Sequence, residues 1–223
     1  MSAPLVVMVP GLGLGEAACA ATLARLPGAS RVVRLPGYGC PADRDADLAP
    51  AALAGPLMRA VGDVSAPVVL VGHSASCQVV AEAAARFPAS VSAIVLIGPT
   101  TDPRGASWSG LAQRWLRTAF WERPWQVPLL VREYARTGPR SMLRAMDAAR
   151  SHPLHEALAA CRVPILVLRG RHDRIAPEDW CRRLPGGDAV TLRAGGHMIP
   201  LTHGFDVARA IDAWLTRIAA SSR

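Results

Sequence analysis

The chain has 223 residues, 51% of them hydrophobic, and a mean hydropathy of +0.21, which is enough for one large enzyme-like core. Its net charge is +8, and all 25 basic residues are arginine. No apolar run reaches the roughly 18 residues of a membrane span, and no zinc-finger, RNA-binding or basic-helix signature accompanies the arginines. We therefore expect no membrane span and no nucleic-acid partner.

The first residues and the cysteines both indicate the cellular compartment that we expect for the protein. Residues 1–4 lead into an apolar run without a preceding basic segment, which is not the pattern of a signal peptide. Five cysteines form an odd set with no close pairing motif: Cys19, Cys40, Cys77, Cys161 and Cys181. Reduced thiols in a cytoplasmic protein are the simplest interpretation.

Apolar runs alternate with helical patterns along most of the chain. This alternation predicts an α/β fold, with a parallel sheet covered by helices on both faces. Strands are expected near 5–10, 31–35, 67–72, 92–98, 163–169 and 188–193, and helices near 16–26, 48–62, 75–87, 177–184 and 204–219. We expect six parallel strands with right-handed crossovers and a site at their carboxyl ends.

A glycine-rich segment, Gly11-Leu12-Gly13-Leu14-Gly15, follows the first expected strand and invites comparison with dinucleotide-binding loops. That fingerprint requires its third glycine one position later, where Glu16 stands, and the second expected strand carries no acid for a ribose. The sequence therefore argues against a dinucleotide cofactor.

The segment Gly72-His73-Ser74-Ala75-Ser76 follows a buried apolar run and precedes an alanine-rich helical pattern. A strand that turns abruptly into a helix leaves its turn residue exposed near the helix N-terminus, where a developing oxyanion is stabilised. Ser74 is thus a candidate nucleophile, although a serine here could also be an ordinary helix cap.

An acid and a histidine follow at the ends of later strands. Asp173 comes after the run that ends at Gly170, and His197 comes after two glycines beyond the last expected strand. Serine, acid and histidine in this order are typical of one hydrolase fold. Asp102, after the fourth strand, is a rival acid, and His172 is a weaker rival base.

These motifs together resemble the α/β-hydrolase family over nearly the whole chain, from Leu5 to about Ile218. The resemblance implies a Ser74–His197–Asp173 triad, and an oxyanion hole formed by the backbone N–H of Ala75 and of Leu12 or Gly13. It departs from the family pattern in two places. Ser76 stands where glycine is usual, and Pro10 replaces the histidine that usually precedes Gly11.

Residues 101–160 interrupt the alternation of strands and helices. Residues 101–150 hold nine arginines against four acids, and the whole segment contains three helical-looking pieces and four of the six tryptophans. The resemblance implies a helical cap here, inserted into a core formed by 1–100 and 161–223. We expect the substrate pocket to be lined by Trp108, Trp115, Trp121, Trp125, His73 and Met198, although tryptophans that only pack the cap onto the core are the plainer alternative.

The predicted function is a serine hydrolase that cleaves a carboxylic ester of a small or medium lipophilic substrate, without metal or organic cofactor. His152 and His155 lack nearby ligands for a metal site. A thioesterase or acyltransferase remains open, because an acidic acyl carrier protein would fit the arginine-rich insertion. Carbon–carbon bond hydrolysis, lyase activity and non-catalytic ligand binding also remain open.

Overall fold

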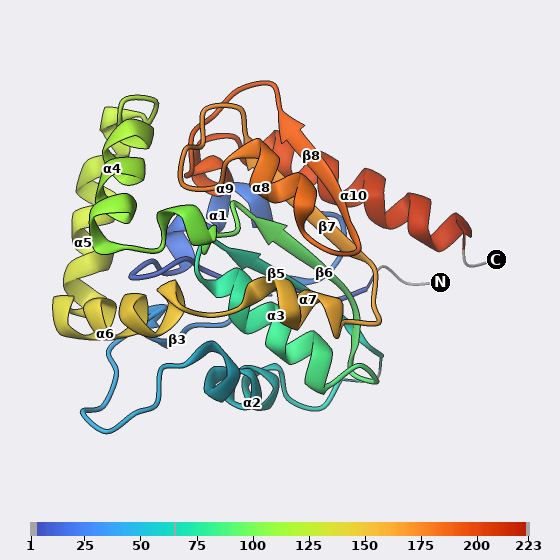
Figure 1. The fold of residues 1–223 in the computed structure, drawn as a ribbon. Coiled ribbons are helices and arrows are strands. Elements are labelled where there is room, and N and C mark those ends of the chain that lie inside the picture. Colours follow the sequence, from blue (N-terminus) through green and yellow to red (C-terminus); the bar gives the residue numbers. More distant parts are fainter. Residues whose placement is uncertain (1–3, 65, 222–223) are drawn as a thin grey trace.

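The computed structural model describes residues 4–64 and 66–221, and its centre is a six-stranded, wholly parallel sheet (Figure 1). The strands are β1 (Val6–Val9), β2 (Ser30–Val32), β5 (Val68–His73), β6 (Val91–Ile97), β7 (Ile165–Gly170) and β8 (Gly187–Leu192). Their spatial order is β2-β1-β5-β6-β7-β8. This confirms the α/β fold and the six predicted strands, while residues 1–3, where we expected no signal peptide, lie outside the described residues.

Alternate residues of each strand point to opposite faces of the sheet and feed two apolar cores. Val7 and Val9 of β1 join a core beneath α2 (Pro50–Val61), α3 (Ser76–Arg86), α7 (Leu154–Ala159) and α8 (Glu178–Arg183). Val6 and Met8 join a second core beneath α10 (Gly204–Ser221). The continuous apolar runs are therefore explained by burial on both sides.

The predicted helix at 16–26 is replaced by two short pieces, the 3-10 helix η1 (Glu16–Ala18) and α1 (Ala20–Leu23). Here tertiary packing overrides local helix propensity. The Thr22 hydroxyl donates to the carbonyl of Pro200 at 2.8 Å, and a Cβ on Gly204 would collide with the backbone of Ala21. The close approach of α9 (Ile199–Thr202) and α10 thus fixes this segment in a tight turn.

A small second sheet, absent from the prediction, pairs β3 (Leu35–Pro36) with β4 (Gly39–Cys40). Two-residue strands are too short to show alternation in a sequence. Gly37 and Gly39 both have positive φ, and a Cβ on Gly37 would meet the Cβ of Ala145 at 2.6 Å. The connection between these strands therefore needs glycine both for its backbone and for close contact with the helix α6 (Pro139–Arg150).

Residues 101–160, called the helical insertion below, lie between β6 and β7. They contain η2 (Pro103–Gly105), α4 (Trp108–Ala119), η3 (Pro124–Gln126), α5 (Val127–Thr137), α6 (Pro139–Arg150) and α7. The Ser107 hydroxyl caps α4 by accepting from the Gly110 N–H at 3.1 Å, and Gly138, with φ of 81°, separates α5 from α6. Figure 1 shows α4, α5 and α6 to one side of the sheet, whereas α7 lies against α3.

Of the helices in the described part of the chain, none is both long and apolar enough to cross a bilayer.

Candidate active site

Ser74 occupies the turn between β5 and α3 in a strained backbone conformation. Its φ is 59°, a value that residues other than glycine rarely adopt, and its N–H donates to the Ile97 carbonyl at 2.8 Å. Such strain costs about 1–3 kcal/mol and persists where the surrounding structure imposes it. A Cβ on Gly72 would lie 2.7 Å from the Cα of Cys77, so this turn also requires glycine where strand and helix nearly touch.

Ser76 replaces the usual glycine with a side chain that ties the turn together. Its hydroxyl accepts from the His73 N–H at 2.8 Å, and it lies 2.8 Å from the Val9 carbonyl and 2.9 Å from that of His73. The hydroxyl thus links the nucleophile turn to the neighbouring strand β1. The departure from the family pattern adds a brace here, and it leaves the turn intact.

His197 lies between the other two residues that the sequence selected. Its Nε2 is 2.8 Å from the Ser74 hydroxyl oxygen, and its Nδ1 is 2.7 Å from Oδ2 of Asp173. Because a carboxylate only accepts, Nδ1 carries the proton, and the Ser74 O–H then donates to Nε2. Three segments more than 20 residues apart in sequence therefore meet in one hydrogen-bonded series.

Asp173 is fully buried, and its second oxygen is held by the backbone. Oδ1 accepts from the N–H groups of Ile175 and Ala176 at 2.9 and 3.0 Å. Arg169, at the end of β7, donates to the carbonyls of Asp173 and Ala176 at 2.7 and 2.8 Å. These bonds fix the loop so that Oδ2 faces the imidazole.

The buried pair of His197 and Asp173 shifts both pKa values toward the charged forms. Burial lowers the pKa of His197, but the Asp173 carboxylate and its hydrogen bond raise it above its ordinary value overall. Burial raises the pKa of Asp173, but attraction to His197 and the hydrogen bonds to the carboxylate lower it overall. The site can therefore stabilise an imidazolium next to Ser74.

Asp102, the rival acid, is occupied elsewhere. It is buried, and it accepts from the guanidinium of Arg104 at 2.8 Å and from that of Arg114 at 2.7 Å. Burial raises its pKa, while the hydrogen bonds from the two arginines lower it overall. His197 is therefore paired with Asp173, whereas Asp102, just after β6, is paired with Arg114 of α4 and so attaches that helix to the end of the strand.

Two backbone N–H groups near Ser74 are available to a substrate. Across the described residues, the N–H of Ala75 and the N–H of Leu12 have no hydrogen-bond acceptor. The N–H of Gly13, by contrast, donates to the Gly37 carbonyl at 2.9 Å. Of the two alternatives left open by the sequence for the second donor, the geometry therefore favours Leu12.

His73 supports the site as a neutral residue. Its Nε2 lies 3.0 Å from the His197 carbonyl, so it donates a proton to that oxygen. Burial and the neighbouring His197 lower its pKa to about 3. His73 therefore fixes the backbone of the proposed base and carries no charge near neutral pH.

Glu122, in the helical insertion, was not identified from the sequence. Its Oε1 accepts from the N–H groups of His197 at 2.6 Å and of Met198 at 2.9 Å, and its Oε2 accepts from Gln126. A Cβ on Gly196 would collide with this carboxylate, which explains a glycine before the histidine. Nothing in the local pattern around Glu122 signals this long-range contact.

The tryptophans expected in the pocket are largely open to solvent. Trp108, Trp115, Trp121 and Trp125 are 44%, 55%, 50% and 59% exposed. Trp121 stacks on His172, the weaker rival base, with ring centroids 3.8 Å apart. It also lines a surface hollow of about 410 Å³ with Arg117, Phe120 and Arg174. Their role in substrate binding stays a prediction.

Side chains that the sequence did not single out surround the loop after β1. A Cβ on Gly13 would lie 2.7 Å from Tyr134 of α5 and from Met142 of α6. Met198, which we did expect near the site, is buried in a small apolar cluster with Leu14 and Ala18. These residues contact the first-strand loop, on the side of the sheet where Ser74 lies.

The other histidines have structural partners or lie on the surface. Nε2 of His152 is 2.8 Å from Glu82, and Nδ1 of His203 is 2.9 Å from the Thr202 hydroxyl. His155 is exposed. In the part of the chain that the structure describes, no group of three or more His, Cys, Asp or Glu side chains is arranged to hold a metal ion.

Comparison of the sequence with known protein families identifies a match. The sequence model of the alpha/beta hydrolase family matches residues 6–210. Comparison with curated proteins finds no match.

Several solved structures share the fold at low sequence identity. A hydrolase from Oleispira antarctica has a TM-score of 0.76 at 15% identity, covering 98% of this chain and 91% of its own. A thermophilic esterase from Thermogutta terrifontis has a TM-score of 0.73 at 19% identity, covering 97% and 91%. The enol-lactonase from Burkholderia xenovorans has a TM-score of 0.70 at 20% identity, covering 97% and 92%.

Proposed function

The chain belongs to the alpha/beta hydrolase family, and on this premise we propose that it is a serine hydrolase acting on a carboxylic ester of a small or medium lipophilic substrate. The observation that carries the proposal is the hydrogen-bonded series from the Ser74 hydroxyl through His197 to the buried Asp173. An esterase and an enol-lactonase among the structures of the same fold agree with ester chemistry.

In the proposed mechanism, the Ser74 oxygen attacks the ester carbonyl while Nε2 of His197 takes the hydroxyl proton. The proton then passes from His197 to the leaving alcohol, and the acyl group stays on Ser74. A water molecule, deprotonated by His197, attacks this acyl-enzyme and releases the acid. Asp173 holds the imidazole tautomer and stabilises its charged form in both halves of the reaction.

The oxyanion is proposed to bind to the N–H groups of Ala75 and Leu12. Neither N–H has an acceptor among the described residues, and Ala75 is the N-cap of α3, where the helix dipole favours negative charge. Each such donor contributes roughly 3–4 kcal/mol to the stability of the transition state.

The helical insertion is proposed to serve as a cap over this site. Support comes from Tyr134 and Met142, which contact the loop at Gly13, and from Glu122, which binds the backbone of His197. In this arrangement the lipophilic part of the substrate lies between the cap and the loops at the sheet edge.

A cytoplasmic location is proposed from the thiols. All five cysteines are free, and burial raises the pKa of Cys77 and of Cys19, the latter to about 12. Thiols that are protonated and buried suit a reducing compartment.

A fluorophosphonate probe tests the proposed nucleophile. Wild-type protein should be labelled and should hydrolyse p-nitrophenyl esters, and Ser74→Ala should do neither while keeping its circular dichroism spectrum. Ser76→Ala is the matched control at the same turn, because it removes a hydroxyl without removing the nucleophile and should still be labelled. Unlabelled, folded wild-type protein would overturn the proposal in favour of non-catalytic ligand binding.

A second candidate is a thioesterase or acyltransferase that takes its acyl group from an acidic carrier protein. It is favoured by Arg117, Arg123 and Arg140 of the insertion, which are exposed and have no acidic partner among the described residues. Arg114 is unsuitable as a probe of this idea, because it holds Asp102. Arg117→Glu with Arg123→Glu should slow turnover of a carrier-bound thioester alone, and equal loss with a neutral ester would exclude a carrier.

A further inference from the structure

Helix α4 packs on the rest of the protein through its polar side. Nη2 of Arg114 is 2.7 Å from Asp102, and the Thr118 hydroxyl accepts from the backbone N–H of Arg174 at 3.0 Å. These two residues are four positions apart and share one face of the helix. An ordinary surface helix buries its apolar face, so α4 has the reverse orientation.

The apolar side of α4 is exposed to solvent along its whole length. It is formed by Ala112, Trp115, Leu116, Ala119 and Phe120, which follow the i, i+3, i+4, i+7, i+8 spacing of a single stripe. Trp115 and Leu116 are 55% and 58% exposed, and Phe120 is 88% exposed. A stripe of this kind on a monomer marks a surface that another phase or molecule covers.

The exposed apolar side chains continue along the chain into α5. Trp125 is 59% exposed, Val127 53% and Val131 61%. Together these exposed side chains form the outer face: Trp115, Leu116, Phe120, Trp125, Val127 and Val131. Figure 1 shows α4 and α5 at one border of the molecule, beyond the strands.

The charge around the outer face has a single sign. The acids of the insertion lie elsewhere or are paired, since Asp102 and Glu133 are buried, Glu122 binds backbone N–H groups and Asp147 pairs with Arg150. Glu156 is exposed, but it lies on α7, which packs against α3. Arg117, Arg123 and Arg140 are exposed without an acidic partner among the described residues, and Arg174 lies beside Arg117 and Phe120 at the surface hollow.

We propose that the outer face docks this protein on an anionic phospholipid surface. Tryptophan, phenylalanine and leucine from amphipathic helices enter the boundary between headgroups and acyl chains, while arginines bind the phosphates. An anionic membrane also attracts each nearby arginine through its surface potential. The helix lies on the membrane in this arrangement and does not span it.

Charge argues against a second copy of this chain as the occupant. A symmetric dimer through this face would bring the same patch together twice, and so would place the unpaired arginines of both copies in one apolar interface. Desolvated like charges are costly. Anionic phosphates supply the counter-charge that a second copy lacks.

Vesicle binding tests this proposal independently of the proposed catalysis, since the Ser74→Ala variant can be used throughout. Sedimentation should compare large vesicles of phosphatidylcholine with vesicles of phosphatidylcholine and phosphatidylglycerol. Binding to the anionic vesicles should be tighter by about tenfold or more and should weaken in high salt. Leu116→Asp with Phe120→Asp should lower it about tenfold or more, as should Arg117→Glu with Arg123→Glu.

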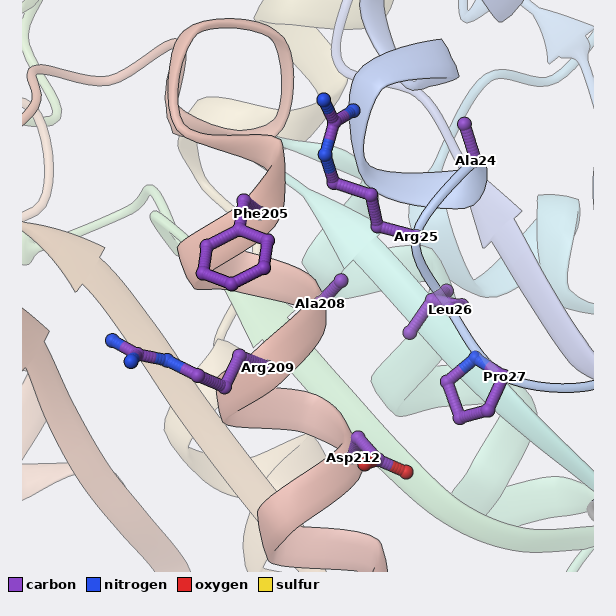
Figure 2. Close-up of a pocket in the computed structure, with 8 residues that line it drawn as sticks. All are labelled: Ala24, Arg25, Leu26, Pro27, Phe205, Ala208, Arg209 and Asp212. Carbon is purple, nitrogen blue, oxygen red and sulfur yellow. The ribbon is translucent and has the colours of Figure 1, made fainter.

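Phe205 on α10 provides the matched control. It is 61% exposed, its ring lies 5.6 Å from the guanidinium of Arg209, and Arg25 and Asp212 line the same hollow (Figure 2). Here Arg209 is paired with Asp206 and Arg25 donates to the Ala21 carbonyl, so one exposed aromatic side chain is present beside arginines but without the apolar stripe that surrounds Phe120. Phe205→Asp should leave vesicle binding unchanged.

Three results would overturn the proposal. The first is folded wild-type protein that ignores anionic vesicles, and the second is equal loss of binding in Phe205→Asp and Phe120→Asp. The third is a dimer in sedimentation, or a complex with an acidic carrier protein, that Phe120→Asp dissolves while vesicles do not bind. Loss of ester hydrolysis in Ser74→Ala with vesicle binding intact keeps the two proposals separate.

Discussion

Replacing Glu122 should show whether the helical insertion positions the catalytic base. The carboxylate accepts two backbone N–H groups, those of His197 and Met198. A hydrogen bond to a charged group contributes about 1.5–3 kcal/mol and a neutral one about 1 kcal/mol. Glu122 is only partly buried, so we take the lower values. Glu122→Ala should then raise the activation free energy by about 2–3 kcal/mol, which lowers kcat/KM roughly 30- to 150-fold.

The glutamine variant separates the charge from the hydrogen bonds. Glu122→Gln keeps an acceptor oxygen, so its loss in kcat/KM should be roughly 5-fold, equivalent to about 1 kcal/mol. The Glu122 charge helps to raise the pKa of His197, so its removal should shift the acidic limb of the pH profile to lower pH. A purely structural role would not move that limb.

The assay is kcat/KM for a neutral p-nitrophenyl ester across the acidic pH range. Asp147→Asn is the control, because Asp147 belongs to the same insertion but pairs with Arg150 at the surface and should change neither quantity. The reasoning is refuted by a Glu122→Ala variant that keeps wild-type kcat/KM together with a Glu122→Gln variant whose acidic limb is unmoved.

Three further predictions concern single positions. Asp173→Asn should reduce kcat roughly 1,000- to 10,000-fold, while Asp102→Asn should leave kcat nearly unchanged but cost about 2 kcal/mol in urea unfolding; the opposite pattern would reassign the acid. The pKa of His73 is about 3 in the folded protein against an ordinary 6.5, so between these two pH values the unfolded chain binds one more proton than the folded protein. The free energy of unfolding therefore decreases by about 1.4 kcal/mol for each unit by which the pH is lowered. Urea unfolding of His73→Gln between pH 7 and 5 should lack this slope, and an unchanged slope would mean that His73 is already charged. Gly72→Ala should destabilise by about 3 kcal/mol or more through its clash with the start of α3. Gly55→Ala on α2, where the new methyl group would meet only the end of the Arg59 side chain at 3.4 Å, should stabilise by about 0.5–1 kcal/mol in thermal unfolding.

The sheet could be predicted because each strand is a continuous apolar run buried on both sides. The same runs placed Ser74, Asp173 and His197, since the carboxyl ends of parallel strands share one edge of the sheet. The structure brings these three side chains together, and their catalytic role stays a proposal. The choice between Asp102 and Asp173 was beyond the sequence, because both follow strands and only the tertiary fold gives Asp102 its two arginines.

The helical insertion could not be predicted in the same detail. Its helical spacing was visible, but spacing does not say which side of a helix meets the core. The stripe through Trp115 and Phe120 is the kind of pattern that normally packs inward, yet it is exposed here. Glu122 was missed for a related reason, since its partners are backbone N–H groups some 75 residues away.

The attachment of the insertion has an energetic consequence. The Thr137 hydroxyl donates to the Gly13 carbonyl at 3.0 Å, and Glu122 binds the N–H of His197, so one segment steadies both the loop beside the proposed oxyanion donor and the proposed base. A membrane or other partner that binds one position of the insertion more tightly must therefore also stabilise the arrangement of Gly13 and His197 that goes with that position. Binding at the two places is then reciprocal. If a partner bound at α4 changes the affinity for a transition-state analogue at Ser74 by some factor, the bound analogue changes the affinity for that partner by the same factor.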